Sequence, residues 1–125
     1  MKDISDMQYP PAYDPQRVGE YPAYVNSGGG IFYDQVLEYR VWVHPLGKDV
    51  YYHAFVTYQE ALQFSKSTLN AERPLVLVSQ EEHINEPEPG KFIHVKEQRI
   101  TEWKPEWLKK AKGTKKNIPL FLNRN

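Results

Sequence analysis

The stretch from Tyr39 to Ser65 changes its hydrophobic period partway along, and this change constrains the fold more than any other feature of the chain. Up to Phe55 the apolar residues recur at every second position, which is typical of a strand with one buried face. After Thr57 they recur at every third or fourth position, which is typical of an amphipathic helix. The sequence therefore predicts strands that lead directly into a helix.

Two alternating runs, residues 32–44 and 50–56, are separated by the turn-forming stretch HPLGKD, and this predicts an antiparallel hairpin. One face of the first run would carry Tyr33, Leu37, Tyr39, Val41 and Val43. The other face would carry Asp34, Glu38, Arg40 and His44 beside Val36 and Trp42. Because this second face holds most of the charges, we expect it to face water.

The four residues from Thr57 to Glu60 have the Thr-x-x-Glu pattern of a capping box. We therefore expect Thr57 to begin a helix that ends by Asn70 and Pro74. Its buried stripe is predicted to contain Tyr58, Ala61, Leu62, Ser65 and Leu69.

The second half of the chain predicts two more strands and two short packed segments. The apolar run 74–80 is typical of a central strand buried on both faces, and we expect it to continue to Ile84. The stretch NEPEPG (85–90) predicts a turn, and a four-residue loop at 87–90 would place Glu86 opposite Lys91 and His83 opposite His94; a fourth strand would span 91–100. Pro105 favours the start of a short helix over 105–111, and the run NIPLFL is expected to pack back onto the body.

These elements predict an α+β fold: a mostly antiparallel sheet of about four strands in the order β-β-α-β-β, with one packed helix and a short C-terminal helix. The 125 residues suffice for one modest core. Residues 1–30 read as a Pro/Tyr-rich N-terminal arm that ends in Gly28-Gly29-Gly30. Residues 31–125 then form a single α+β domain with a basic C-terminal segment.

The net charge is zero but unevenly distributed. From Lys104 onward there are seven basic residues and one acid, a balance of +6, which leaves −6 for residues 1–103. A basic tail on an acidic body can bind nucleic acid, another anionic surface or the body itself. The residues predicted to bind a partner are Glu86 and Glu88 on the acidic hairpin and Lys109, Lys110 and Lys112 in the tail.

Several classes of site are excluded or weakly supported. The absence of cysteine excludes disulfides, thiolate metal sites and cysteine nucleophiles. The histidine pairs His44/His53 and His83/His94 flank the two turns, but neither spacing supplies the third and fourth ligands of a zinc site, so we predict no metal. The sequence contains no Walker loop or nucleophile elbow, and we predict no catalytic residue.

Three tryptophans lie near the basic segment or on the first strand, at positions 42, 103 and 107. Exposed rings beside lysines would suit stacking of single-stranded nucleic acid. The alternative, which we favour, is that Trp103 and Trp107 belong to the core.

Several strings, namely GGIFYDQVLEYRVWVHP, YYHAFVTYQEALQFS, PLVLVSQ, INEPEPGKFIHV, RITEW and IPLFL, carry a family resemblance. Together they span Gly29 to Leu122 and resemble small bacterial proteins identified as members of the GNAT-type acetyltransferase family. The resemblance implies an N-acetyltransferase that uses acetyl-coenzyme A. That family's hallmark is a Gln/Arg-x-x-Gly-x-Gly/Ala turn between a strand and a helix, which holds the pyrophosphate. The corresponding turn here, FVTYQEA, contains no glycine, so no cofactor-binding or catalytic residue is carried over.

We therefore predict a small non-catalytic binding or regulatory module that needs no cofactor. Its partner would be a protein or small molecule, with a second copy of the chain as one candidate. The alternatives are an acetyl-coenzyme A-dependent N-acetyltransferase and, less favoured, a nucleic-acid binder that uses the basic tail. The absence of a secretory signal and of a long apolar run predicts a cytoplasmic protein that does not bind membranes.

Overall fold

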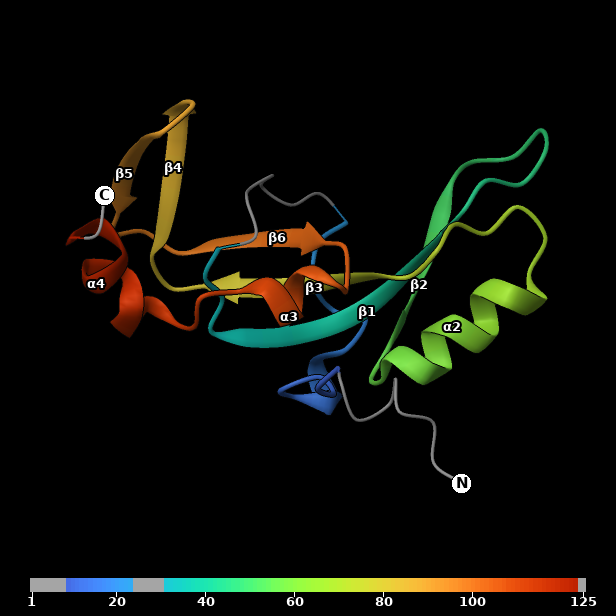
Figure 1. The fold of residues 1–125 in the computed structure, drawn as a ribbon. Helices are drawn as coiled ribbons and strands as arrows, with labels where there is room; N and C mark the ends of the chain where they lie inside the picture. Colours follow the sequence, from blue (N-terminus) through green and yellow to red (C-terminus); the bar gives the residue numbers. More distant parts are fainter. Residues whose placement is uncertain (1–8, 24–30, 124–125) are drawn as a thin grey trace.

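The computed structural model describes residues 9–23 and 31–123 and has the predicted α+β architecture (Figure 1). Strands form two antiparallel sheets, and helices pack against them. The elements in chain order are η1 (Pro15–Arg17), β1 (Gln35–Val43), β2 (Tyr51–Phe55), α2 (Tyr58–Ser67), β3 (Leu75–Gln80), β4 (His83–Glu88), β5 (Lys91–Val95), β6 (Arg99–Trp103), α3 (Trp107–Lys110), η2 (Lys115–Asn117) and α4 (Ile118–Asn123).

The main sheet has the strand order β2-β1-β3-β6. β3 lies between β1 and β6, and Val76, Leu77 and Val78 are fully buried, which confirms the predicted central strand. The expected continuation to Ile84 is wrong, because β3 ends at Gln80 and Ile84 belongs to β4. The two glutamates that follow Gln80 are too polar to extend a strand that is buried on both faces.

The second sheet is the hairpin β4–β5, which stands away from the main sheet beside α4 (Figure 1). Here Glu88 pairs with Lys91, and His83 lies opposite Val95 and not opposite His94, so both predicted pairings are wrong. The physical reason is that β4 continues through Glu88, the turn is the shorter Pro89-Gly90, and the register shifts within β4.

The predicted fourth strand over 91–100 is in fact two strands. β5 pairs only with β4, whereas β6 pairs with β3 in the main sheet. The exposed polar residues Lys96, Glu97 and Gln98 separate them. The described structure therefore contains six strands where the sequence predicted about four.

A bulge in β1 changes which residues share a face. The register against β3 shifts between Val36 and Glu38, so Leu37 is the extra residue. As a result Val36 packs with Tyr39 in the core beneath α2, whereas Leu37 packs on the opposite face. The predicted faces were wrong at these two positions, because simple alternation assumes a strand without a bulge.

The helix α2 begins as predicted, with Thr57 as its N-cap. The Glu60 amide donates to Thr57 Oγ1 (3.2 Å) and the Thr57 amide donates to Glu60 Oε1 (3.2 Å), which completes the capping box. Ala61 is fully buried, but Leu69 is 84% exposed, so its predicted place in the buried stripe is wrong. The helix ends at Ser67, before the helical spacing reaches Leu69.

Helices cover one face of the main sheet, and the N-terminal segment covers the other. The larger core contains Val36, Tyr39, Val41, Ala61, Val76, Val78, Trp103 and Leu108, beneath α2 and α3. Residues 9–23, which we call the arm, start on this side with Tyr9 and end on the opposite face, where Tyr21 packs with Leu37 and Leu77.

The C-terminal segments pack as the sequence predicted. Ile118 is fully buried, and Phe121 makes edge contacts with Phe32 and Phe92, so the run NIPLFL lies against the body as α4. The described residues include no helix that is both long enough and apolar enough to cross a membrane.

Candidate binding groove

The face of the main sheet that the sequence predicted to be wet is buried at Glu38 and Arg40, whereas His44 at its end is exposed. The side chains of Glu38 and Arg40 are both 0% exposed. Arg40 Nε donates to Glu38 Oε2 (2.6 Å), and Arg40 Nη1 donates to Glu102 Oε2 (3.0 Å). The expectation was wrong because the arm, which is distant in sequence, covers this face. We call the face around Arg40, with Glu38, Tyr52 and Glu102, the arm face.

The arm is held mainly through its backbone. Arg40 Nη2 donates to the Pro22 carbonyl (2.6 Å), and Arg40 Nη1 donates to the Ala23 carbonyl (3.3 Å). The Gly19 amide donates to Glu38 Oε1 (2.8 Å), and the Tyr52 hydroxyl donates to the Tyr21 carbonyl (3.0 Å). The charged side chains of the arm face therefore already have hydrogen-bond or ion-pair partners within the chain.

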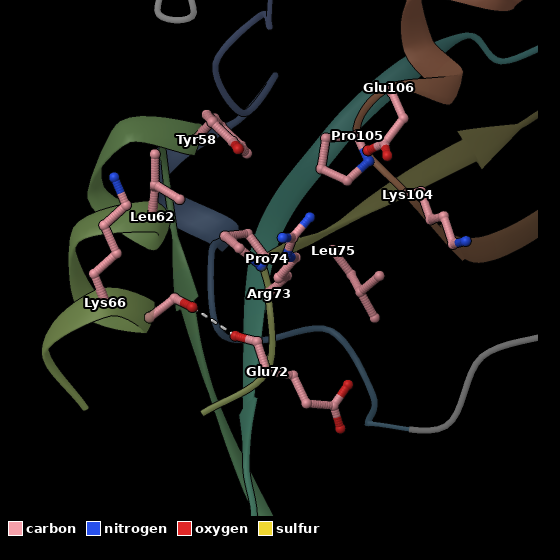
Figure 2. A pocket seen from close by; sticks show the side chains of 11 residues that line it. Tyr58, Leu62, Lys66, Glu72, Arg73, Pro74, Leu75, Lys104, Pro105 and Glu106 are labelled. Carbon is pink, nitrogen blue, oxygen red and sulfur yellow. Dashed lines mark hydrogen bonds between the residues drawn. The ribbon is translucent and has the colours of Figure 1, made fainter. Parts of the chain in front are cut away.

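The other face of the molecule carries an open groove of about 570 Å³ between α2 and the segment that follows β6 (Figure 2). Its lining residues are Tyr58, Leu62, Ser65, Lys66, Glu72, Arg73, Pro74, Leu75, Lys104, Pro105 and Glu106. Figure 2 shows Lys66 and Lys104 on opposite sides, with Arg73 between α2 and the 104–106 segment. The groove thus joins apolar walls to three cationic groups and one exposed acid, Glu106.

Local contacts determine the shape of the groove. The Ser65 hydroxyl donates to the Glu72 carbonyl (2.6 Å) and ties α2 to the segment that enters β3 (Figure 2). The Glu72 carboxylate contacts Nε2 of His44, which is not among the residues that line the groove. Pro74 and Pro105 are buried in the walls, and their rings fix the backbone on both sides.

The three cations differ from Arg40 in exposure and in pairing. Lys66, Arg73 and Lys104 are all exposed. Within residues 9–23 and 31–123, the ion pairs involve Arg40, His44, His94 and Lys115, and none involves a cation of the groove. An anion that entered the groove would therefore not have to displace an existing carboxylate partner.

The acidic residues predicted to bind a partner both lie on β4 of the projecting hairpin, where each makes a different contact. Glu86 Oε2 accepts from the Gly90 amide (2.8 Å), so this carboxylate stabilises the hairpin turn. Glu88 lies opposite Lys91 at the end of β4 and is exposed. The hairpin does not contribute to the groove lining.

The basic residues predicted to bind a partner lie on and after α3. Lys109 Nζ lies 5.2 Å from the centre of the Tyr9 ring, a cation–π contact with the arm. The Lys112 amide donates to the Ile31 carbonyl (2.6 Å), and Lys110 is exposed. Farther along, Lys115 Nζ lies 3.3 Å from Glu81 Oε2. The basic segment is thus folded partly onto its own acidic body.

The histidines and tryptophans are engaged in contacts within the chain. His94 Nε2 lies 2.8 Å from Glu82 Oε1, and His83 Nδ1 lies 3.0 Å from the Glu97 carbonyl. Burial, with a smaller effect of the nearby Arg99 charge, lowers the pKa of His83 from its usual 6.5. No group of three potential metal ligands comes together among the residues that the structure describes.

Trp103 is fully buried and lies edge-on to both Tyr33 and Trp107, as expected for a core residue. Trp42 Nε1 donates to Glu102 Oε2 (3.0 Å), and its ring packs against Tyr52. Trp42 therefore belongs to the arm face and is distant from the basic segment in sequence.

The sequence analysis did not single out Lys66, Arg73 or Lys104 as site residues. They come from α2, from the approach to β3 and from the end of β6, which are separate in sequence. A local signal was present only in the pairing of a cation with the proline that follows it, at Arg73-Pro74 and at Lys104-Pro105, where a rigid backbone adjoins a charge.

Comparison with known proteins does not assign a family: no family model, no curated protein and no solved structure matches this chain.

Proposed function

We propose that this chain is a small binding module that takes an organic anion with an apolar portion in the groove between α2 and residues 104–106. The observation that carries the proposal is the set of three exposed cations, Lys66, Arg73 and Lys104, around partly apolar walls and without ion-pair partners in the described chain. A carboxylate or phosphate group would meet the cations while the apolar portion contacts Leu62 and Pro105.

The groove's size and composition support a small ligand. A volume of about 570 Å³ lies within the range of roughly 300–1,000 Å³ that is usual for small-molecule sites. Arginine favours planar, bidentate contact with carboxylate or phosphate, whereas lysine acts as a point charge. Arg73 would therefore orient the anion, and the two lysines would add attraction from either side.

Coenzyme A, which is also an anion, is a less favoured ligand. The start of α2 is where the acetyltransferase resemblance would place a pyrophosphate, but the Glu60 amide already donates to Thr57 Oγ1. The Glu60 carboxylate accepts from the Thr57 amide and hydroxyl, which puts a negative charge where the phosphates would lie. The proposal therefore places any anion in the groove and not at the helix start.

Nucleic acid is also less favoured, because Lys109 and Lys115 already contact Tyr9 and Glu81 of the same chain. Binding through the basic segment would have to compete with these contacts. Duplex binding that did occur would weaken with salt, with a log–log slope of about −0.9 for each phosphate contacted.

The test is thermal unfolding and calorimetry with phenylacetate, phenyl phosphate, coenzyme A, acetyl-coenzyme A and a short single-stranded DNA. A ligand at about 100 times its Kd stabilises the folded chain by ~2.7 kcal/mol. We expect stabilisation by an aryl anion, its loss in Arg73→Gln, and its retention in Lys48→Gln, which removes an exposed cation of the β1–β2 loop. Stabilisation that Arg73→Gln leaves intact would overturn the proposal.

A further inference from the structure

We propose that Arg99 is the centre of a second anion site, which binds a small oxyanion, a phosphate group or a carboxylate, with the help of Asn85. The site lies where the main sheet meets the β4–β5 hairpin, since Arg99 begins β6 and Asn85 belongs to β4 (Figure 1). Neither residue lines the groove, so the inference does not depend on the function proposed for it.

The first observation is that Arg99 is a buried cation whose hydrogen-bond partners are neutral. Only 7% of its surface is exposed. Its Nε donates to Gln80 Oε1 (2.7 Å), and its Nη1 donates to Asn85 Oδ1 (3.3 Å). Within residues 9–23 and 31–123, no carboxylate forms an ion pair with Arg99. Burial lowers the pKa of Arg99 from its usual value, as expected for a charge without a counter-charge.

A comparison with Arg40 shows what Arg99 lacks. Arg40 is also buried, but it pairs with the carboxylates of Glu38 and Glu102. Removing a guanidinium from bulk water is costly unless an opposite charge compensates for the lost hydration. Arg40 has that compensation within the chain and Arg99 does not. An anion from solution would supply it, whereas a water molecule offers only a neutral acceptor.

The second observation is that part of the Arg99 guanidinium is accessible from outside. The guanidinium carries more N–H groups than its bonds to Gln80 and Asn85 use, and Nη2 has no partner in the described chain. The described side-chain atoms that are both buried and without a partner belong to Gln59, Thr101 and Trp103, and none belongs to Arg99. Nη2 therefore reaches solvent, and an anion can approach it without displacing either amide.

The third observation is that the neighbouring amides hold the guanidinium in a fixed position. Gln80 is buried, and its Nε2 donates to the Phe32 carbonyl (2.7 Å), so its Oε1 is directed at Arg99. Asn85 is exposed, and while its Oδ1 accepts from Arg99, its Nδ2 can donate to an anion beside Nη2. The planar fork of arginine matches two oxygens of one phosphate or carboxylate group. The site therefore offers positioned donors from both sheets.

His83 provides an internal reporter of an anion at Arg99. It is buried, and the charged and titratable groups that act on it are Arg99 of β6, His94 of β5 and Glu97, which lies between those strands. Burial lowers the pKa of His83 most, the Arg99 charge lowers it further, and Glu97 opposes both effects. An anion that offsets the Arg99 charge should therefore raise the pKa of His83.

The experiment is an NMR titration of the full-length chain with sulfate and, separately, with acetate, at constant ionic strength maintained with chloride. Sulfate represents a phosphate group and keeps its charge over the range in which histidine titrates, and acetate represents a carboxylate. We expect saturable shifts of the Arg99 Nε–H group and of the His83 ring, and a rise of about half a unit in the pKa of His83. Tighter binding of sulfate would assign the site to a phosphate group, and tighter binding of acetate to a carboxylate.

Asn85→Asp is the sharpest variant, because it keeps the shape of an exposed side chain and gives Arg99 a carboxylate within the chain. We expect it to weaken binding of both anions at least ~10-fold. Arg99→Gln should abolish the saturable shifts of the His83 ring. Arg73→Gln in the groove is the control and should leave the affinity at Arg99 unchanged.

The absence of saturable shifts at Arg99 and His83 would overturn the proposal, since water alone would then solvate the accessible part of the guanidinium. Native affinity in Asn85→Asp would also overturn it, because the anion would then bind elsewhere. Loss of binding in Arg73→Gln would assign sulfate and acetate to the groove and would contradict the proposal as well. The groove is tested with aryl anions and different reporters, so either proposal can fail without the other.

Discussion

The arm face and the groove show two different uses of positive charge in one small sheet protein. On the arm face, Arg40 is fully buried and is paired with Glu38, Glu102 and two carbonyls of the arm. Around the groove, Lys66, Arg73 and Lys104 are exposed and have no ion-pair partner within the described chain. Because a buried charge requires partners and an exposed one does not, the first region contributes to the fold, whereas the cations of the second are the ones that we propose to bind a ligand.

The difference also explains why the two regions should respond differently to mutation. Removing one partner of a buried pair leaves an uncompensated charge and is strongly destabilising. Removing an exposed, unpaired cation usually changes stability very little. The same chemical change can therefore be made in both regions as a matched comparison.

The largest effect is expected for Arg40→Met, which leaves Glu38 buried without its partner. We expect a loss of about 3–5 kcal/mol in the free energy of unfolding, measured by urea denaturation. The matched change Lys104→Met in the groove should alter that free energy by no more than about 0.5 kcal/mol. Similar losses in both variants would remove the distinction between the two regions.

The pH dependence of stability should reveal the buried attachment of the arm to Tyr39. The Tyr39 hydroxyl donates to the Pro10 carbonyl (2.5 Å), and burial, together with neighbouring tyrosines, raises the pKa of Tyr39 far above its usual 10.0. Above pH 10 the unfolded chain loses this proton and the folded chain keeps it, so stability falls as the pH rises. The contribution of this one group to the slope rises toward about 1.4 kcal/mol per pH unit as the unfolded chain becomes fully ionised above pH 10.

Tyr39→Phe is the control for that measurement. Between pH 10 and pH 11 its free energy of unfolding should fall less than that of the native chain, by about 1 kcal/mol. Parallel slopes would show that the Tyr39 hydroxyl ionises equally in the folded and unfolded chains, which contradicts its burial.

A smaller effect is expected at the start of α2, which forms one wall of the groove. Thr57→Ala removes the oxygen that accepts from the Glu60 amide, and we expect a loss of ~1 kcal/mol in unfolding free energy. Thr57→Ser keeps the hydroxyl and should lose less than half as much. A loss in Thr57→Ser as large as that in Thr57→Ala would argue that the cap does not stabilise this helix.

The parts of this fold that could be predicted from sequence are those with a local cause. The capping box at Thr57 and the continuous apolar run of β3 each lie within a few neighbouring residues, and both are present in the structure. The bulge at Leu37 has no such local signal. The types of residue in β1 are the same with or without a bulge, yet the bulge places Val36 on the other face of the strand.

The candidate site was hidden from the sequence for a different reason. The burial of Arg40 depends on Pro22 and Ala23, and the groove brings together Lys66, Arg73 and Lys104 from separate elements. Alternation in β1 correctly placed Arg40 on the face of the strand opposite to that of Tyr39. Whether that face is exposed to water depends on the path of the arm. Long-range contacts of this kind have no local pattern to reveal them.

The smallest expected change in stability belongs to the groove cations. Lys66→Gln and Lys104→Gln should each alter the unfolding free energy by less than about 0.5 kcal/mol, because neither side chain is buried or ion-paired in the described structure. Both variants should nevertheless bind an aryl anion more weakly than the native chain. A large loss of stability in either would mean that its charge supports the fold.

The central claim, that the groove is open to an anion while the arm face is already occupied, is tested most directly by NMR titration of the full-length chain with phenylacetate. We expect saturable shifts of backbone amides around Lys66, Arg73 and Lys104, no shifts around Arg40 and Tyr52, and loss of the groove shifts in Arg73→Gln. Shifts that map to Arg40 and Tyr52, or groove shifts that persist in Arg73→Gln, would contradict the account.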